Sequence, residues 1–222
     1  MLTVHNLENS RSLRLLWLLE ELGVDYQIKH YKRHKVTKLA QDDYKKLHPV
    51  GKSPVVSDGD LVLAETGAIV EYIVEKYGEG KLRPQKDDPN YVRYLYWLHS
   101  SEGSLMPLLL LKMMMVKLVD KTPLLVKPLA KAAISPMDFG YVSPSLKKLM
   151  SYLDSELSKS RWLTGDELSA ADVMISFAID VAHLAFDLER DYPSVYRFDR
   201  EYKAREAYKV ALEKNGPYDL NL

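Results

Sequence analysis

The chain has 222 residues, 46% of them hydrophobic and 28% charged, and its 31 basic side chains equal its 31 acidic ones. This is a globular composition, and the length suits two compact domains. The balanced charge argues against nucleic acid and against anionic membrane surfaces as partners. Because the chain contains no cysteine, structural disulfides, cysteine-based metal sites and a cysteine nucleophile are excluded.

The N-terminus lacks the apolar core of a signal peptide. The most apolar run, residues 105–119, is interrupted by a proline and two lysines and is too short to cross a bilayer. We therefore expect an intracellular, cytoplasmic protein without a membrane span and without a bound metal.

The first residues predict a strand followed by a helix. Apolar and polar residues alternate over residues 2–5, the period of a strand. A leucine-rich helix follows, which Ser10 or Ser12 can cap and which Gly23 ends. The chain therefore opens with the β-α signal of an α/β domain.

Further strand and helix signals complete this domain. Alternation over residues 24–28 predicts a second strand, and the basic stretch 32–46 predicts a loop with a short helix. Apolar residues on both sides of Asp58-Gly59 predict a β-hairpin, and residues 69–77 have the apolar spacing of a helix. The order β-α-β-α-β-β-α predicts a mixed four-stranded sheet.

The second half of the chain shows helical signals only. We expect an α/β domain over residues 1–80, a linker over residues 81–90 and an all-helical domain over residues 91–222. One long helix is predicted over residues 91–118, and residues 172–188 are apolar nearly all round, as in a buried helix. Between them, prolines are expected to break the chain at Pro123, Pro128, Pro136 and Pro144.

Two short segments carry candidate chemistry. Pro54 follows a glycine turn and begins a strand, where a cis peptide bond would leave backbone groups free to pair with a short peptide; a loop with ordinary trans prolines is the alternative. Glu65 and Thr66 stand where a strand changes to a helix. The free N–H groups there can bind a carboxylate while Glu65 holds an ammonium, and simple helix capping is the alternative.

These segments resemble a known family. HPVGKSP at residues 48–54, followed by Glu65-Thr66, is similar to the glutathione-binding signature of cytosolic glutathione transferases. LTGDELSAAD at residues 163–172 resembles the family's folding motif, a loop that leads into a capping box. The string SRSLRLLWLLE at residues 10–20 looks closest to a fungal and bacterial branch. The resemblance covers almost the whole chain and implies a thioredoxin-like first domain.

Family membership implies that glutathione is the cosubstrate. Glu65 and Thr66 would hold its γ-glutamyl head. The backbone of Ser53, just before Pro54, or of Val55, would pair with the cysteinyl part.

The resemblance leaves two further contacts open. The glycyl carboxylate needs a cation, and either Lys52 or Lys38 could supply it. Glu102, on the long predicted helix, is a candidate to reach across a dimer interface toward the γ-glutamyl amine, since the family implies a homodimer.

The chemical task is to lower the pKa of the glutathione thiol with one hydrogen-bond donor and the positive end of the first helix. Counting back from Gly23 places the serine of the theta and phi classes on Asn9. We expect Ser10 as the donor, with Asn9 as the alternative; Ser12 is near enough to contact the sulfur, and Ser10 could instead be a helix cap. The missing cysteine excludes the omega-, lambda- and glutaredoxin-like classes.

The pocket for a second substrate is predicted on the long helix. Its candidate side chains are Tyr94, Trp97, Met113, Met114 and Met115, with core and dimer packing as the alternative for most of them. An apolar wall there would select an apolar electrophile.

Three functions are compatible with these features. The resemblance favours an enzyme that adds the glutathione thiolate to an electrophile or reduces an organic hydroperoxide with it. A glutathione-binding regulatory module without turnover is the second, and a structural interaction domain that needs no glutathione is the third.

Overall fold

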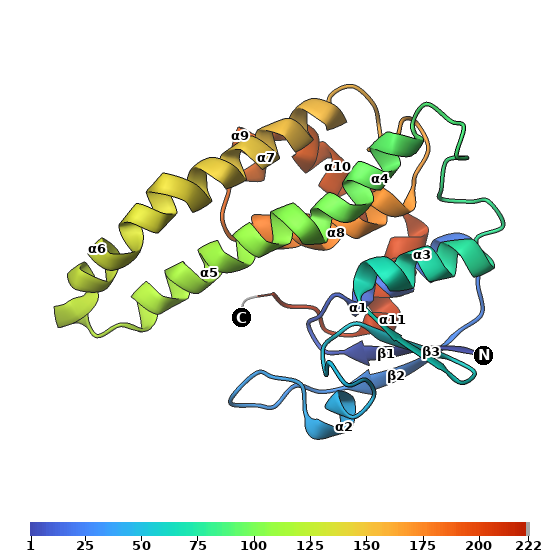
Figure 1. Cartoon of the computed structure of the whole chain (residues 1–222), viewed down its shortest axis with the longest axis horizontal. Helices are drawn as coiled ribbons and strands as arrows, with labels where there is room; N and C mark the ends of the chain where they lie inside the picture. Colours follow the sequence, from blue (N-terminus) through green and yellow to red (C-terminus); the bar gives the residue numbers. More distant parts are fainter. Residues whose placement is uncertain (221–222) are drawn as a thin grey trace.

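The computed structural model describes residues 1–220 and contains an α/β unit beside a bundle of helices (Figure 1). The sheet has the strand order β2-β1-β3-β4. β1 pairs parallel with β2 and antiparallel with β3, which pairs antiparallel with β4. The predicted mixed four-stranded sheet is confirmed. Its strands are β1 (Leu2–Leu7), β2 (Gln27–Tyr31), β3 (Val55–Asp58) and β4 (Leu61–Ala64).

The helix end and the hairpin turn predicted for the α/β unit are confirmed. Gly23 ends the first helix in the left-handed region, at φ 69°, and Gly59 turns the β3–β4 hairpin at φ 60°. The second strand begins later than predicted, because the N–H of Val24 bonds back to the carbonyl of Leu19 and belongs to the helix terminus. The helices of this unit are α1 (Ser12–Leu22), α2 (Asp42–Lys45) and α3 (Thr66–Tyr77).

Helix α1 lies at the centre of the molecule. It packs against β1 and α3 and also against α8 (Ala170–Ala182) and α11 (Glu206–Asn215) of the helical part. Its residues from Ser12 to Leu19 are all buried, Arg14 included. Its leucines lie on every side of the helix, so both the α/β unit and the helical part pack against it. The N-terminus of α1 lies where these two parts meet.

The helical part begins with the predicted long helix. It runs from α4 (Tyr91–Ser100) through a π-helical segment, Ser101–Leu105, into α5 (Met106–Lys121). The remaining elements are the 3-10 turn η2 (Leu124–Val126), α6 (Lys127–Met137), the π-helical segment Asp138–Val142, α7 (Ser143–Leu157), α9 (Leu188–Asp191) and α10 (Pro193–Ala204). The division into domains at residues 81–90 stays a prediction.

The expected break by prolines is wrong for three of the four. Pro128 and Pro144 lie in the first turns of α6 and α7, where a missing N–H removes no helical hydrogen bond. Pro136 lies inside α6, and a π-helical segment carries the chain on into α7. Pro123 alone precedes a turn between two helices.

Helix α8 is buried as predicted, although it is shorter. Every residue of the helix except Asp180 is buried. The predicted capping box is present: the Asp172 carboxylate accepts hydrogen bonds from the N–H and the hydroxyl of Ser169, each at 2.8 Å. The helix ends at Ala182, ahead of the turns that lead to α9.

Within residues 1–220, no helix is both long enough and apolar enough to span a membrane. The same residues contain no cluster of three or more His, Cys, Asp or Glu side chains suited to a metal ion.

Candidate active site at the junction of the two parts

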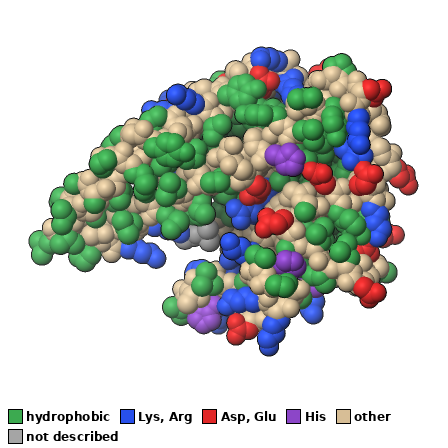
Figure 2. Space-filling model, viewed as in Figure 1, with side chains coloured by type: hydrophobic (Ala, Val, Ile, Leu, Met, Phe, Trp, Pro, Cys, Tyr) green, Lys and Arg blue, Asp and Glu red, His purple; other side chains and the backbone are tan. Residues whose placement is uncertain are grey.

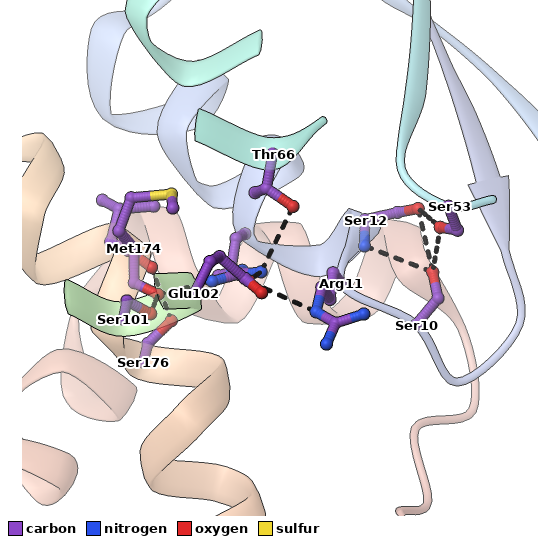
Figure 3. A network of polar contacts seen from close by, with 11 residues as sticks. Ser10, Arg11, Ser12, Ser53, Thr66, Ser101, Glu102, Met174 and Ser176 are labelled. Carbon is purple, nitrogen blue, oxygen red and sulfur yellow. Dashed lines mark hydrogen bonds and ion pairs between the residues drawn. The ribbon is translucent and has the colours of Figure 1, made fainter. Parts of the chain in front are cut away.

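Three serine hydroxyls meet at the N-terminus of α1 (Figure 3). The Ser53 hydroxyl donates to Ser10 Oγ at 2.9 Å, and the hydroxyls of Ser10 and Ser12 lie 2.9 Å apart. The backbone N–H of Ser12 also donates to Ser10 Oγ at 3.2 Å. Ser10 therefore accepts two hydrogen bonds, and its own hydroxyl proton can be donated either to Ser12 Oγ or to a ligand in the cavity.

The cluster reaches a cavity through two of its members. Ser10 and Ser53 line a cavity of about 300 Å³, whereas Ser12 is fully buried behind them. The peptide bond between Ser53 and Pro54 is cis, whereas the segment taken alone favours the ordinary trans form. Ser10 thus faces the cavity from the loop before α1, and Ser53 faces it from the loop before β3.

Asn9 lies on the same cavity wall but is engaged elsewhere. Its side-chain oxygen accepts the N–H of Asp219 at 2.8 Å, and its carbonyl accepts from the Arg33 guanidinium at 3.1 Å. Its φ of 48° lies in the left-handed region, which asparagine tolerates better than most residues. Asn9 thereby shapes the loop that presents Ser10.

A smaller polar cavity, of about 170 Å³, adjoins the first. Glu65 lines it with φ 72°, a strained conformation for a glutamate, and its exposed carboxylate forms no ion pair with any residue of the described chain. Thr66, a candidate N-cap by sequence, is instead the first residue of α3; Glu65 occupies the cap position without a capping hydrogen bond from its side chain. The cavity is lined by Arg11, Val50, Lys52, Ser53, Pro54, Ala64, Glu65, Thr66 and Glu102.

A buried arginine ties this cavity to the helical part. Arg14 is only 2% exposed, and its guanidinium donates to the carbonyl of Met174 at 2.5 Å, to Thr66 Oγ1 at 3.4 Å and to the Glu102 carboxylate. Burial lowers the pKa of Arg14, and Glu102 opposes that shift. The π-helical segment places Glu102 here, where Arg11 also pairs with it at 3.3 Å.

Sequence reasoning missed this contact. It considered Glu102 for a dimer partner, whereas the structure turns its carboxylate toward two arginines of its own chain. One signal was present: Arg14 interrupts an otherwise apolar helix, and a charge in such a helix needs a buried partner.

The two candidate cations for a carboxylate are placed differently. Lys52 lines both cavities. Lys38 lines neither, and its carbonyl accepts a hydrogen bond from Arg33 at 3.0 Å. Arg33, which the sequence did not single out, lines the larger cavity and holds this loop to the carbonyls of Glu8 and Asn9.

The far wall of the larger cavity is apolar and comes from α5, α8 and the C-terminal segment. Of the predicted pocket residues, Met113 lines it, whereas Met114 is 59% exposed. Tyr94, Trp97 and Met115 are core residues, in keeping with the alternative interpretation. The apolar lining consists of Met106, Leu110, Met113, Phe177, Val181, Leu184 and Leu220, with Leu7, Leu39 and Ala40 on the α/β side.

Comparison with known proteins gives these cavities a context. Residues 1–75 match the family described as Glutathione S-transferase, N-terminal domain, and residues 128–206 match Glutathione S-transferase, C-terminal domain. Glutathione S-transferase 3 of Schizosaccharomyces pombe is 34% identical, over 96% of this chain and 88% of the relative. Glutathione S-transferase 1 of Saccharomyces cerevisiae is 30% identical, over 96% of this chain and 95% of the relative.

A solved structure agrees with these sequence matches. The crystal structure of a glutathione S-transferase from Actinobacillus pleuropneumoniae has a TM-score of 0.83 at 32% identity, over 98% of this chain and 94% of that one. Fungal and bacterial relatives are therefore both similar along nearly the whole chain, as the first-helix string indicated. The chain belongs to the glutathione S-transferase family.

Proposed function

We propose that this chain is a glutathione transferase that adds the glutathione thiolate to apolar electrophiles. The observation that carries the proposal is the position of Ser10, which lines the larger cavity and accepts a hydrogen bond from Ser53, a residue that lines both cavities. Arg11, Lys52 and Ser53 line both cavities, so one ligand can extend from the first into the second. The names of the relatives support the same activity.

Glutathione fits the polar side in one orientation. Its γ-glutamyl ammonium would lie between the carboxylates of Glu65 and Glu102, and its α-carboxylate would meet Thr66 at the N-terminus of α3. The cysteinyl part would pair with the backbone of Ser53 rather than Val55, because Val55 already has a strand partner on each side. Lys52 would hold the glycyl carboxylate.

Ser10 is our proposed activating group. A thiol with a pKa near 8.5 is mostly protonated at neutral pH. A hydrogen bond from the Ser10 hydroxyl, with the positive end of α1 behind it, stabilises the thiolate and lowers that pKa. The thiolate then forms a carbon–sulfur bond with the electrophile held against Met113 and its neighbours, and a leaving group such as halide departs with its bonding electrons. Positioning supplies much of the rate.

The experiment that tests activation is a pH titration of the bound thiol, followed by thiolate absorbance in the ultraviolet after subtraction of apo-protein and free glutathione. A bound pKa well below that of free glutathione supports a transferase. Loss of the shift in Ser10→Ala, with the shift retained in Asn9→Ala, identifies Ser10 as the donor. Saturated binding with an unshifted pKa contradicts the enzyme and favours a binding module.

We further propose a homodimer in the cytoplasm. Val92 and Tyr96 are 74% and 45% exposed on α4, where they flank a shallow apolar depression that a second copy can cover. A light-scattering mass of one chain would contradict the dimer. A cysteine-free chain suits a reducing compartment, and cell fractionation tests that location.

A further inference from the structure

Helices α5 and α6 form an arm that projects from the body of the molecule (Figure 1). We call residues 118–131, which form the outer end of this arm, the arm tip. Its side chains include large apolar groups in open solvent, and Figure 2 shows hydrophobic side chains over this end. The exposed fractions are 56% for Leu118, 84% for Leu124, 95% for Leu125, 48% for Val126 and 72% for Leu129.

Nothing in the described chain covers these groups. No residue of η2 or of α6 is buried. An isolated helix of this length is marginal in water, since most helical stability in proteins comes from packing an apolar face. The arm tip is therefore an apolar surface that lacks a partner within residues 1–220.

The charge of the arm is one-sided. Residues 113–137 contain four lysines, Lys117, Lys121, Lys127 and Lys131, and a single acidic residue, Asp120. Asp120 pairs with Lys127 at 3.6 Å. The other three lysines have no ion-pair partner in the described part of the chain. The zero net charge of the whole chain thus conceals a local positive excess beside exposed leucines.

We propose that the arm tip docks on an anionic phospholipid surface. Leu124 and Leu125 would enter the boundary between headgroups and acyl chains, while Lys121 and Lys131 would contact the anionic headgroups. This combines the two signals that stable peripheral binding needs, apolar insertion and basic charge. The balanced charge of the whole chain argued against anionic membranes as partners. For the arm tip, the local positive charge reverses that expectation.

A further cavity leads from the candidate active site toward the arm tip. A second cavity, of about 440 Å³, continues from the apolar one along α5, and the two share Met113, Val181 and Leu184. Its lining extends outward to Val116, Lys117 and Asp120. An apolar compound dissolved in the lipid would therefore have a path from the arm toward the candidate active site, with charged side chains at its outer end and apolar ones where it joins the larger cavity.

Vesicle flotation of the full chain tests the proposal. The probes are vesicles of phosphatidylcholine alone and vesicles with about one-third phosphatidylserine. We expect binding to the second kind only, weakened by salt. Lys121→Glu/Lys131→Glu should lower the partition coefficient about 25-fold or more, because each lysine near the surface is worth about fivefold. Leu124→Ser/Leu125→Ser should lower it by about tenfold, through lost insertion.

Matched controls separate the arm tip from exposure and charge in general. Val36→Ser removes an equally exposed apolar side chain, since Val36 is 83% exposed, and Lys35→Glu/Lys86→Glu reverses two exposed lysines elsewhere. Neither control should change binding. Conjugation in vesicle-free solution should be the same in the arm variants as in the parent chain, which keeps this test independent of the proposed transferase activity.

Three outcomes would overturn the proposal. The first is that the chain does not float with anionic vesicles, and the second is that the control variants lose as much vesicle binding as the arm variants. The third is that Leu124→Ser/Leu125→Ser binds vesicles as the parent chain does while its light-scattering mass falls. The last result would assign the arm tip to contact between two copies of the chain.

Discussion

The two walls of the candidate active site are built in different ways. The polar wall comes from loops at strand and helix ends, where Asn9 and Glu65 have positive φ angles and hydrogen bonds fix the backbone. The apolar wall comes from side chains such as Met113 and Phe177, on helices far apart in the sequence. A wall of fixed backbone and charge recognises one ligand closely, whereas an unbranched methionine adapts to several. We therefore expect strict recognition of glutathione and loose recognition of the electrophile.

The largest effect should come from the donor on the polar wall. Ser10→Ala removes the hydroxyl that we propose faces the sulfur, and we expect kcat/KM for an apolar aryl halide to fall about 100-fold, as for loss of a donor to developing charge. The bound thiol pKa should rise toward that of free glutathione. Ser10→Thr, which keeps a hydroxyl, is the matched variant. An unchanged rate in Ser10→Ala would transfer the role to another group of the loop.

The next effect should come from Glu65, the charge proposed to hold the γ-glutamyl head group. Glu65→Gln should raise the KM for glutathione by about 10- to 100-fold, because a hydrogen bond to a charged group contributes about 1.5–3 kcal/mol. Glu71, on the outward side of the same helix, pairs with His99 at 3.6 Å and lines neither cavity. Glu71→Gln is the control and should leave KM unchanged. Equal effects of the two would show that the helix charge matters rather than the contact.

The apolar wall should be more tolerant. Met113→Ala should raise the KM for an apolar electrophile about fivefold to tenfold and leave the KM for glutathione unchanged, since lost methylenes in a pocket cost about 1–3 kcal/mol. Met114→Ala removes the same side chain from the exposed face of α5 and should have no effect on either constant. A change in the glutathione KM would show that the two walls are coupled.

The smallest effect concerns Asp58 at the end of β3, the strand that begins directly after Pro54. Hydrogen bonds from Lys76, Tyr77 and Tyr72 hold the pKa of Asp58 well below its usual range. A carboxyl group with a lower pKa in the folded state stabilises the fold above its unfolded pKa, near 3.8, and loses that contribution as the pH falls below it.

Melting temperatures measured from pH 6 down to about pH 2 check this contribution. The parent chain should lose stability more steeply than Asp58→Asn below about pH 4. Parallel curves for the two proteins would contradict the role assigned to Asp58. Activity at neutral pH should be the same in both, because Asp58 lies in neither cavity.

What the sequence could predict follows the same division between local and non-local features. The hairpin at Asp58-Gly59, the helix end at Gly23 and the capping box at Ser169 depend on neighbouring residues, and the structure contains all three. The contact between Arg14 and Glu102 joins residues distant in the sequence. No local pattern specifies such a contact.

The prolines show that a local pattern can also predict a feature that the structure does not contain. A proline reads as a break when only its neighbours are considered, yet Pro128 and Pro144 fit first helical turns. Tertiary packing likewise decides which methionines of α5 line the cavity. Met113 lines it, the adjacent Met114 is exposed, and Met115 is in the core. The sequence alone does not show which side of α5 contacts α8. The assignment of donor and cation among Ser10, Asn9, Lys52 and Lys38 stays a prediction.

The packing of α1 also determines when this protein can fold during its synthesis. Helix α11 covers α1, with Arg205 and Lys214 paired to Glu21 and Glu20, and the carbonyl of Asn215 accepts a hydrogen bond from Asn6 of β1. While the ribosome is still making residues 100–200, Trp17 and the leucines beside it have no cover from α11. The first strand and helix to emerge are thus covered only by residues made about two hundred codons later. Until synthesis is nearly complete, a nascent chain exposes apolar surface, which is the usual target of chaperones.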